Sequence, residues 1–202
     1  MAAARSLRSP LRAATFETLL GLLSVTGLRI GEALRLDRDD VDLDDGILVI
    51  RSSKFGKSRE VPLHATTVEA LAAYARQRDR LCPHPVVPAF FLSTAGTRLL
   101  YCNVHQAWLE LVRRAGLRPR SPHCRPRPHD LRHSFAVRTL LDWYRDGLDV
   151  QAHMPALSTY LGHVHPGHTY WYLSGAPELL NLVVARLDTA ADHHAAPHRA
   201  PR

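Results

Sequence analysis

Cysteine is scarce in this chain, with only three among 202 residues. The three are widely separated, odd in number and without CxxC spacing: Cys82, Cys102 and Cys124. This pattern excludes a disulfide framework and a cysteine zinc cluster. Cys124 follows His123, which could suggest a thiol nucleophile, but prolines flank the pair and nothing else supports it. We therefore expect free thiols and a cytoplasmic protein.

Long apolar runs are lacking as well. The longest near the N-terminus covers residues 19–26 between Glu17 and Arg29, and it is far too short for a transmembrane helix. The opening residues, MAAARSLRSPLRAA, contain no acid, but no apolar core with a small-residue cleavage site follows them. We interpret residues 1–9 as a flexible N-terminus, with a targeting peptide as the alternative.

Acidic residues are outnumbered, because 19 Asp and Glu face 26 Lys and Arg and leave a net charge of +7. Such an excess favours a polyanionic partner, for example nucleic acid. Between residues 113 and 138 there are eight arginines and one acid, Asp130. This run could be an ordinary solvated loop. However, arginine makes planar, bidentate contacts with phosphate oxygens, which makes the run a candidate phosphate-binding segment.

The hydrophobic pattern predicts one domain over residues 10–187 and a disordered tail over 188–202, with no internal repeat. Helical spacing occurs over residues 10–24, 29–36, 65–80, 101–115, 128–143, 147–162 and 177–187. Pro155 should bend the sixth helix or begin it. Segments 47–50 and 59–63 predict a β-hairpin around the turn SSKFGKS, with Pro62 at a sheet edge. The expected fold class is mainly α with a small antiparallel β-sheet near residues 41–63.

Three short segments contain the residue types of a reactive site: TGLRIGEALRL at 26–36, PHDLRHSFA at 128–136 and LGHVHPGHTYWYL at 161–173. Each is weak alone. Arg29 and Glu32 could form an ordinary i,i+3 helix pair. His129 and Arg132, one helical turn apart, could belong to a polar surface face.

Taken in this order, with a lysine-bearing hairpin between the first two, the segments resemble the catalytic domain of the tyrosine recombinase, or phage integrase, family. The resemblance covers roughly residues 10–187 and implies an integrase-like α+β catalytic core. The family's first motif is T-G-[LMC]-R-x-x-E-x-x-x-L, and its arginine and glutamate correspond here to Arg29 and Glu32. The second motif, H-x-x-R, corresponds to His129 and Arg132. The histidine of the third motif, L-G-H, is His163, and the tyrosine nine residues after it is Tyr172.

The resemblance implies that Tyr172 attacks a DNA phosphodiester and forms a 3′-phosphotyrosyl intermediate. Because this intermediate keeps the bond energy, rejoining needs no nucleotide cofactor. Arg29 and Arg132 would hold the negative charge of the pentacoordinate phosphorus, a task that many nucleases give to metal ions. We therefore expect neither a cofactor nor a metal.

The remaining roles also follow from the resemblance. Lys54, in the hairpin turn, is the expected proton donor to the leaving 5′-hydroxyl, and Lys57 is the reserve. His129 would bind the phosphate or help to take the tyrosine proton, and His163 would donate to a non-bridging oxygen. Glu32 would support the site by orienting the first arginine and the histidine.

Members of this family act on double-stranded DNA as homotetramers on paired sites, which is the assembly that we expect here. The expected DNA contacts are Lys57, Arg120, Arg125 and Arg127. Residues after about 174 are candidates for docking on a neighbouring protomer. Family members usually carry an N-terminal core-binding domain that clamps the DNA, and we expect it to be absent here.

The predicted function is therefore site-specific recombination, in the integration, excision or transposition of mobile DNA. The alternative is a truncated remnant that binds DNA without recombining it. A purely regulatory DNA-binding protein would need neither Tyr172 nor the Arg-His-Arg set.

Two further alternatives concern the third segment. Zinc could bind His163, His165 and His168, but Pro166 and Gly167 interrupt any helical face and no carboxylate completes the set. Tyr170 is a reserve nucleophile.

Overall fold

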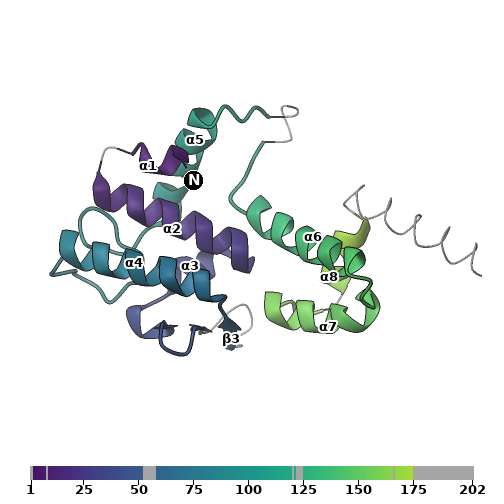
Figure 1. Cartoon of the computed structure of the whole chain (residues 1–202). Helices are drawn as coiled ribbons and strands as arrows, with labels where there is room; N and C mark the ends of the chain where they lie inside the picture. Colours follow the sequence, from purple (N-terminus) through teal and green to yellow (C-terminus); the bar gives the residue numbers. More distant parts are fainter. Residues whose placement is uncertain are drawn as a thin grey trace, which may run out of the picture. The chain divides into compact units, whose positions relative to one another are not determined.

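The computed structural model describes residues 2–7, 9–51, 58–119, 121, 125–165 and 167–174 (Figure 1). Its elements are α1 (Ala2–Arg5), α2 (Pro10–Thr26), α3 (Ile30–Arg35), the 3-10 helix η1 (Arg38–Asp40), β1 (Val41–Asp42), β2 (Ile47–Ile50), β3 (Arg59–Pro62), α4 (Ala65–Leu81), α5 (Tyr101–Arg114), α6 (Asp130–Arg145), α7 (Val150–Leu161) and α8 (Gly167–Ser174). This mainly helical architecture with one small antiparallel sheet confirms the predicted fold class. No helix in the described ranges is long and apolar enough to cross a membrane.

The chain divides into two compact units, Met1–Phe135 and Ala136–Arg202. The division falls inside helix α6. A boundary within a continuous helix leaves no linker composition in the sequence. The expected last helix over 177–187 and the tail over 188–202 lie outside the described residues.

Helix α2 forms the centre of the first unit. The Ser9 hydroxyl accepts a hydrogen bond from the backbone N–H of Arg12 at 3.4 Å, and Pro10 occupies the first turn as predicted. Leu19 and Leu23 are buried on this helix. Figure 1 shows α4 packed alongside α2, a contact that joins elements about fifty residues apart in the chain.

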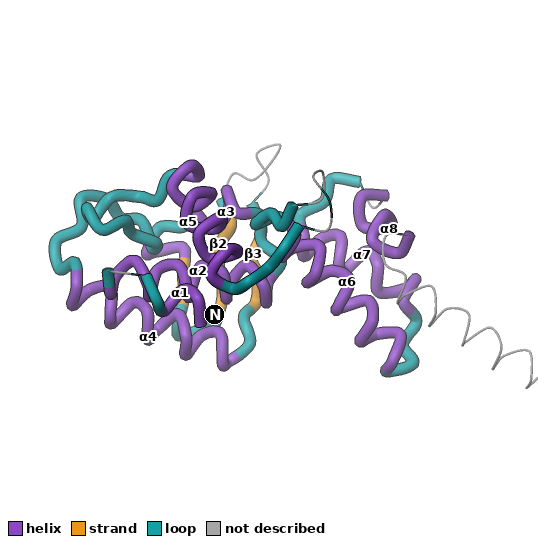
Figure 2. Tube along the Cα trace, turned by 90° about the horizontal axis from the view of Figure 1, so that it is seen from above, coloured by secondary structure: helices purple, strands orange, loops and turns teal. Residues whose placement is uncertain are grey.

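The sheet has the order β1-β2-β3 with antiparallel pairing throughout, and Figure 2 shows its strands in orange. Ile50 pairs with Arg59 and Ile47 pairs with Pro62. Alternation along β2 and β3 buries Leu48, Ile50 and Val61. Because β3 is an edge strand, it tolerates Pro62, as predicted.

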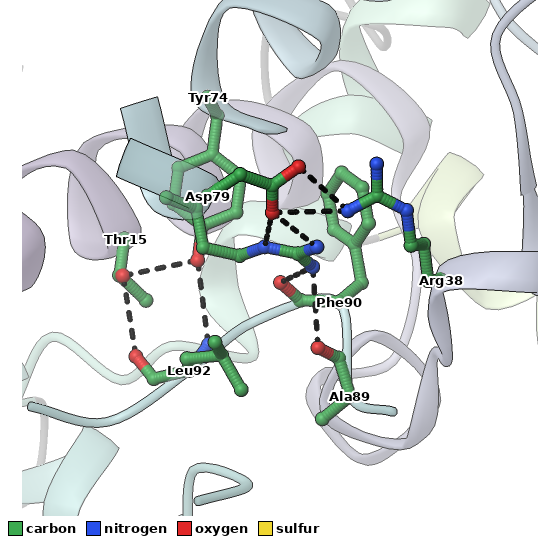
Figure 3. Close-up of polar contacts among 8 residues, drawn as sticks. Thr15, Arg38, Tyr74, Asp79, Ala89, Phe90 and Leu92 are labelled. Atoms are coloured by element: carbon green, nitrogen blue, oxygen red, sulfur yellow. Dashed lines mark hydrogen bonds and ion pairs between the residues drawn. The ribbon is translucent and has the colours of Figure 1, made fainter. Parts of the chain in front are cut away.

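A buried polar network holds α2 and α4 to the segment 89–92 (Figure 3). The Tyr74 hydroxyl lies 3.0 Å from Thr15 Oγ1 and accepts a hydrogen bond from the Leu92 backbone N–H at 3.3 Å. The Tyr74 ring packs against Phe90 and Phe91, with centroids 5.5 and 5.4 Å away. Burial raises the pKa of Tyr74, which therefore serves here as a neutral structural group.

Arg78 extends the same network with a charged side chain that is 3% exposed. It donates to the carbonyl oxygens of Ala89 and Phe90 at 3.3 and 3.0 Å and to the carboxylate of Asp79. Arg38 pairs with the same carboxylate at 2.7 Å. The buried guanidinium is thus held by oxygen acceptors, as a buried charge requires.

The N-terminal residues differ from the expected flexible segment over 1–9. Residues 2–5 form α1, and Ala4 and Leu7 are buried. Arg5 pairs with Glu17 of α2 at 2.7 Å. Local sequence does not predict so short a helix, because packing against α2 stabilises it rather than propensity.

In the second unit, α7 begins at Val150 and not near Pro155. The Asp149 carboxylate caps it by accepting from the backbone N–H groups of Gln151 and Ala152 at 3.0 and 3.2 Å. Pro155 lies inside the helix. Helix α8 packs against α7 and occupies a segment for which the sequence pattern predicted no helix.

Candidate active site

The first arginine of the predicted site begins α3 immediately after a tight turn. Gly27 ends α2 in the left-handed conformation at φ 60°, which glycine adopts without a steric penalty. Leu28 is buried, and Arg29 is the residue before α3. The Glu32 carboxylate accepts the backbone N–H of Arg29 at 3.0 Å. The spacing T-G-x-R-x-x-E is therefore a helix stop followed by a helix start.

The Glu32 carboxylate is 1% exposed and joins two arginines. Arg29 donates from one guanidinium nitrogen at 2.9 Å, and Arg59 donates from two, at 3.1 and 2.9 Å. Burial raises the pKa of Glu32, but the hydrogen bonds and charges from Arg59 and Arg29 outweigh this effect and place the pKa below its ordinary value. Glu32 is therefore ionised at neutral pH, and its bond to Arg29 agrees with the supporting role suggested for it.

Arg59 is the residue that the sequence interpretation missed. A usable signal exists, because side chains two residues apart in a strand share a face. Val61 is fully buried, so Arg59 lies on the inward face of β3. An inward arginine needs a carboxylate or carbonyl partner.

The second arginine comes from the first turn of α6. Arg132 is 2% exposed and donates to the carbonyl oxygen of Gly27 at 2.7 Å. Asp130 supports the start of this helix by accepting the backbone N–H of Arg127 at 2.8 Å. Arg29 and Arg132 therefore meet at one turn, although they are far apart in sequence.

His129 lies among these cations with part of its surface exposed. Burial lowers its pKa, and the positive charges of Arg132, Arg127 and Arg29 lower it further, against the opposing effect of Asp130. The imidazole is therefore neutral at pH 7 and able to accept a proton. The charge of Arg29 acts on His129, so the structure brings three of the predicted residues into one electropositive cluster.

The second unit positions His163 and Tyr172 together. Gly162 ends α7 in the left-handed conformation at φ 68°, which explains the glycine of the L-G-H segment. The Nδ1 atom of His163 lies 2.7 Å from the hydroxyl of Thr169, a fully buried residue that the sequence interpretation did not select. The ring of Tyr172 stacks on the His163 ring, with centroids 6.1 Å apart and planes at 21°.

The two candidate nucleophiles differ in burial on α8. Tyr172 is 5% exposed, whereas Tyr170 is 40% exposed and its hydroxyl donates to the side chain of Gln151 at 3.2 Å. Tyr172 thus shares its surroundings with His163, while Tyr170 contacts α7.

The zinc alternative involves histidine rings that contact one another edge to face. His168 lies 5.9 Å from His163 and 6.0 Å from His165, measured between ring centroids. Among the residues that the structure describes, no group of three or more His, Cys, Asp or Glu is placed to hold a metal ion.

Of the predicted basic contacts, Lys54, Lys57 and Arg120 lie outside the described residues. Arg125 and Arg127 are exposed, and Arg127 also pairs with Asp130 at 3.5 Å. The indole N–H of Trp108 donates to the carbonyl of Pro126 at 2.9 Å and fixes this part of the arginine-rich segment to α5. The exposed guanidiniums are suited to phosphate contact.

Chemically, the first unit provides two guanidiniums and a neutral imidazole at one turn. Such a group is suited to an oxyanion with several charged oxygens, such as a phosphate in a pentacoordinate transition state. The second unit provides a tyrosine hydroxyl beside a histidine. A tyrosine hydroxyl can act as a nucleophile that forms a covalent intermediate.

Comparisons with known proteins agree with this chemistry. The model of the phage integrase family matches residues 1–178. Putative integrase/recombinase y4rB of Sinorhizobium fredii (strain NBRC 101917 / NGR234) is 46% identical over 185 residues, which cover 91% of this chain and 59% of the relative.

Two solved structures share the fold. XerA recombinase has a TM-score of 0.69 and 25% identity, covering 94% of this chain and 58% of XerA. XerH site-specific recombinase, in a post-cleavage complex with its palindromic difH substrate, has a TM-score of 0.68 and 24% identity, covering 94% of this chain and 49% of XerH. The chain spans less than two thirds of the length of each of these proteins.

Proposed function

The chain belongs to the phage integrase family, and we propose that it is a site-specific recombinase that cleaves and rejoins duplex DNA through a 3′-phosphotyrosyl intermediate. The observation that carries this proposal is the bond from Arg132 to the Gly27 carbonyl, because it brings the second arginine to the turn that begins the helix of the first. Integration, excision and transposition of mobile DNA are the processes that such an activity serves.

In the proposed reaction, Arg29, His129 and Arg132 bind the scissile phosphate, and Tyr172 attacks its phosphorus. The bond from the tyrosine oxygen to phosphorus forms while the bond from phosphorus to the 5′-oxygen breaks. Lys54 protonates the leaving 5′-oxygen, with Lys57 as the reserve. Rejoining reverses these steps, since the 5′-hydroxyl of a new strand attacks the phosphotyrosine.

The histidines have different tasks in this proposal. His129, held neutral by burial and by its cationic neighbours, takes the tyrosine proton or binds the phosphate. His163 donates to a non-bridging oxygen, and its bond with Thr169 fixes the ring orientation. The stacking of Tyr172 on His163 keeps the nucleophile beside this donor.

The proposed partner is double-stranded DNA, bound with help from Arg125, Arg127, Arg120 and Lys57. The XerH complex with its substrate supports this choice for a related fold. We propose that the assembly is a homotetramer on two paired sites, because exchange of strands between two duplexes requires four cleavages.

The test uses a pool of nicked suicide duplexes with a randomised centre, in which cleavage releases a short fragment and prevents rejoining. The full chain is expected to form a covalent adduct that survives a denaturing gel. Tyr172→Phe removes the adduct and Tyr170→Phe retains it. An adduct that survives Tyr172→Phe and disappears in Tyr170→Phe assigns the nucleophile to Tyr170. DNA binding by the parent chain without any adduct supports the alternative, a truncated remnant that binds DNA without recombining it.

A further inference from the structure

The Glu32 carboxylate accepts hydrogen bonds unequally from its two arginines. Arg59 makes a fork, with one guanidinium nitrogen on each carboxylate oxygen, at 3.1 and 2.9 Å. The guanidinium of Arg29 donates end-on to a single oxygen at 2.9 Å, and its backbone N–H donates to the other at 3.0 Å. Arg59 therefore holds the bidentate position that a buried carboxylate offers to only one guanidinium.

The same fork links two segments of the proposed site. Arg59 is the first residue of β3 and pairs with Ile50 of β2, so in the sequence it closely follows the segment that contains Lys54 and Lys57. Glu32 lies in the first turn of α3, next to Arg29. One ion pair thus joins the lysine hairpin to the helix of the first arginine.

The charges of Glu32, Arg29 and Arg59 also favour a role for Arg59 beyond packing. One carboxylate and two guanidiniums leave one net positive charge. Arg59 is the more deeply placed of the pair, with 12% of its side chain exposed against 29% for Arg29. Because Arg59 forms the fork with Glu32, the charge of this carboxylate is offset by Arg59 and not by Arg29 alone.

We infer that Arg59 is a positioning residue for DNA cleavage, which acts through Glu32 to set the orientation and the effective charge of Arg29. The inference rests on the proposed function. Arg59 does not touch the substrate in this account. Its loss allows Arg29 to rotate into the vacated bidentate position on Glu32, away from the phosphate.

The test starts with Arg59→Lys, which keeps the charge but cannot form the fork. A duplex recovered from the covalent adducts of the full chain serves as substrate. Its single-turnover cleavage is expected to slow by about 10- to 100-fold, the effect typical of a residue that acts by orienting another one. The control is Arg38→Gln, which removes a different arginine–carboxylate pair, the one with Asp79. It should cleave at the rate of the parent chain.

A second substrate separates positioning from simple loss of structure. A methylphosphonate at the scissile position is neutral and relies less on guanidinium charge, so the defect of Arg59→Lys should shrink on it. A merely structural defect affects both substrates equally. Thermal unfolding of both variants then verifies that the comparison is made between folded proteins.

A double variant tests the route through Glu32 and avoids an unbalanced buried charge. Arg59→Gln combined with Glu32→Gln should be no slower than Glu32→Gln alone, because both changes interrupt one pathway. If the double variant cleaves more slowly than Glu32→Gln by the factor that the Arg59 substitution costs alone, the two residues act independently and the inference is overturned. Cleavage by Arg59→Lys at the rate of the parent chain also overturns it. If the parent chain forms no adduct, the proposed function fails and the inference fails with it.

Discussion

Two buried arginines of the first unit illustrate how the same side chain serves structure in one region and a reaction site in another. Arg78 and Arg132 are 3% and 2% exposed, and both donate to backbone carbonyl oxygens. Around Arg78 the charges alternate, because the Asp79 carboxylate pairs with both Arg78 and Arg38. Around Arg132 cations outnumber anions near one histidine: after burial, the charges of Arg132, Arg127 and Arg29 lower the pKa of His129, and Asp130 opposes them.

The difference shows how a structural polar network can be distinguished from a reaction site. A network in which cations and anions alternate is electrostatically satisfied and stabilises the fold. In a cluster of cations around a neutral histidine, the positive charges repel one another, and a bound anion reduces this repulsion. Burial alone does not distinguish the two arginines, whereas the sign of their neighbours does.

The sharpest test of this comparison is a pair of equivalent substitutions. Arg132→Lys should slow cleavage by about 10²- to 10³-fold, because a lysine point charge replaces a planar donor to the phosphate. Arg78→Lys should leave the rate of the folded protein unchanged. Single-turnover cleavage of the recovered duplex measures both, and equal losses in the two variants would contradict the distinction.

Stability should show the opposite order. Arg78→Met leaves the carbonyl oxygens of Ala89 and Phe90 without their donor and is expected to reduce the free energy of unfolding by about 2 to 3 kcal/mol. Denaturant unfolding monitored by circular dichroism provides the measurement. Arg38→Gln, which removes only the exposed partner of Asp79, should change it by about 0.5 kcal/mol.

The cationic surroundings of His129 predict a pH dependence. Its lowered pKa means that protonation opposes both folding and base function, so the associated stability is present above the ordinary pKa and is lost as pH falls through the lowered one. Cleavage under subsaturating conditions should decline on the acid side, roughly tenfold per pH unit below that pKa. His129→Gln should remove this limb, and an unchanged acid limb in the variant would assign it to another group.

The smallest expected effect concerns the structural tyrosine. Tyr74→Phe removes the hydroxyl that contacts Thr15 and Leu92 and should cost about 1 kcal/mol of unfolding free energy. It should leave cleavage unchanged, in contrast to Tyr172→Phe. Loss of cleavage in folded Tyr74→Phe would show that the structural network around Tyr74 affects the reaction site.

Much of the local structure could be predicted from the sequence. The boundaries of α2, β2 and α4 agree with the apolar spacing to within about two residues, because side-chain periodicity and capping residues act over a few neighbours. Helices α1 and α8 escaped prediction. Both are short, and packing against a neighbouring helix stabilises them more than their own propensity does.

By itself, the sequence determined the turns that begin and end the helices of the site. Gly27 and Gly162 stop their helices and Glu32 caps the next one, since these effects depend on residues within one turn. Only the tertiary structure decided which distant groups meet. Arg132 binds a carbonyl 105 residues away and Arg59 binds a carboxylate 27 residues away, because packing of separate elements places their donors and acceptors together.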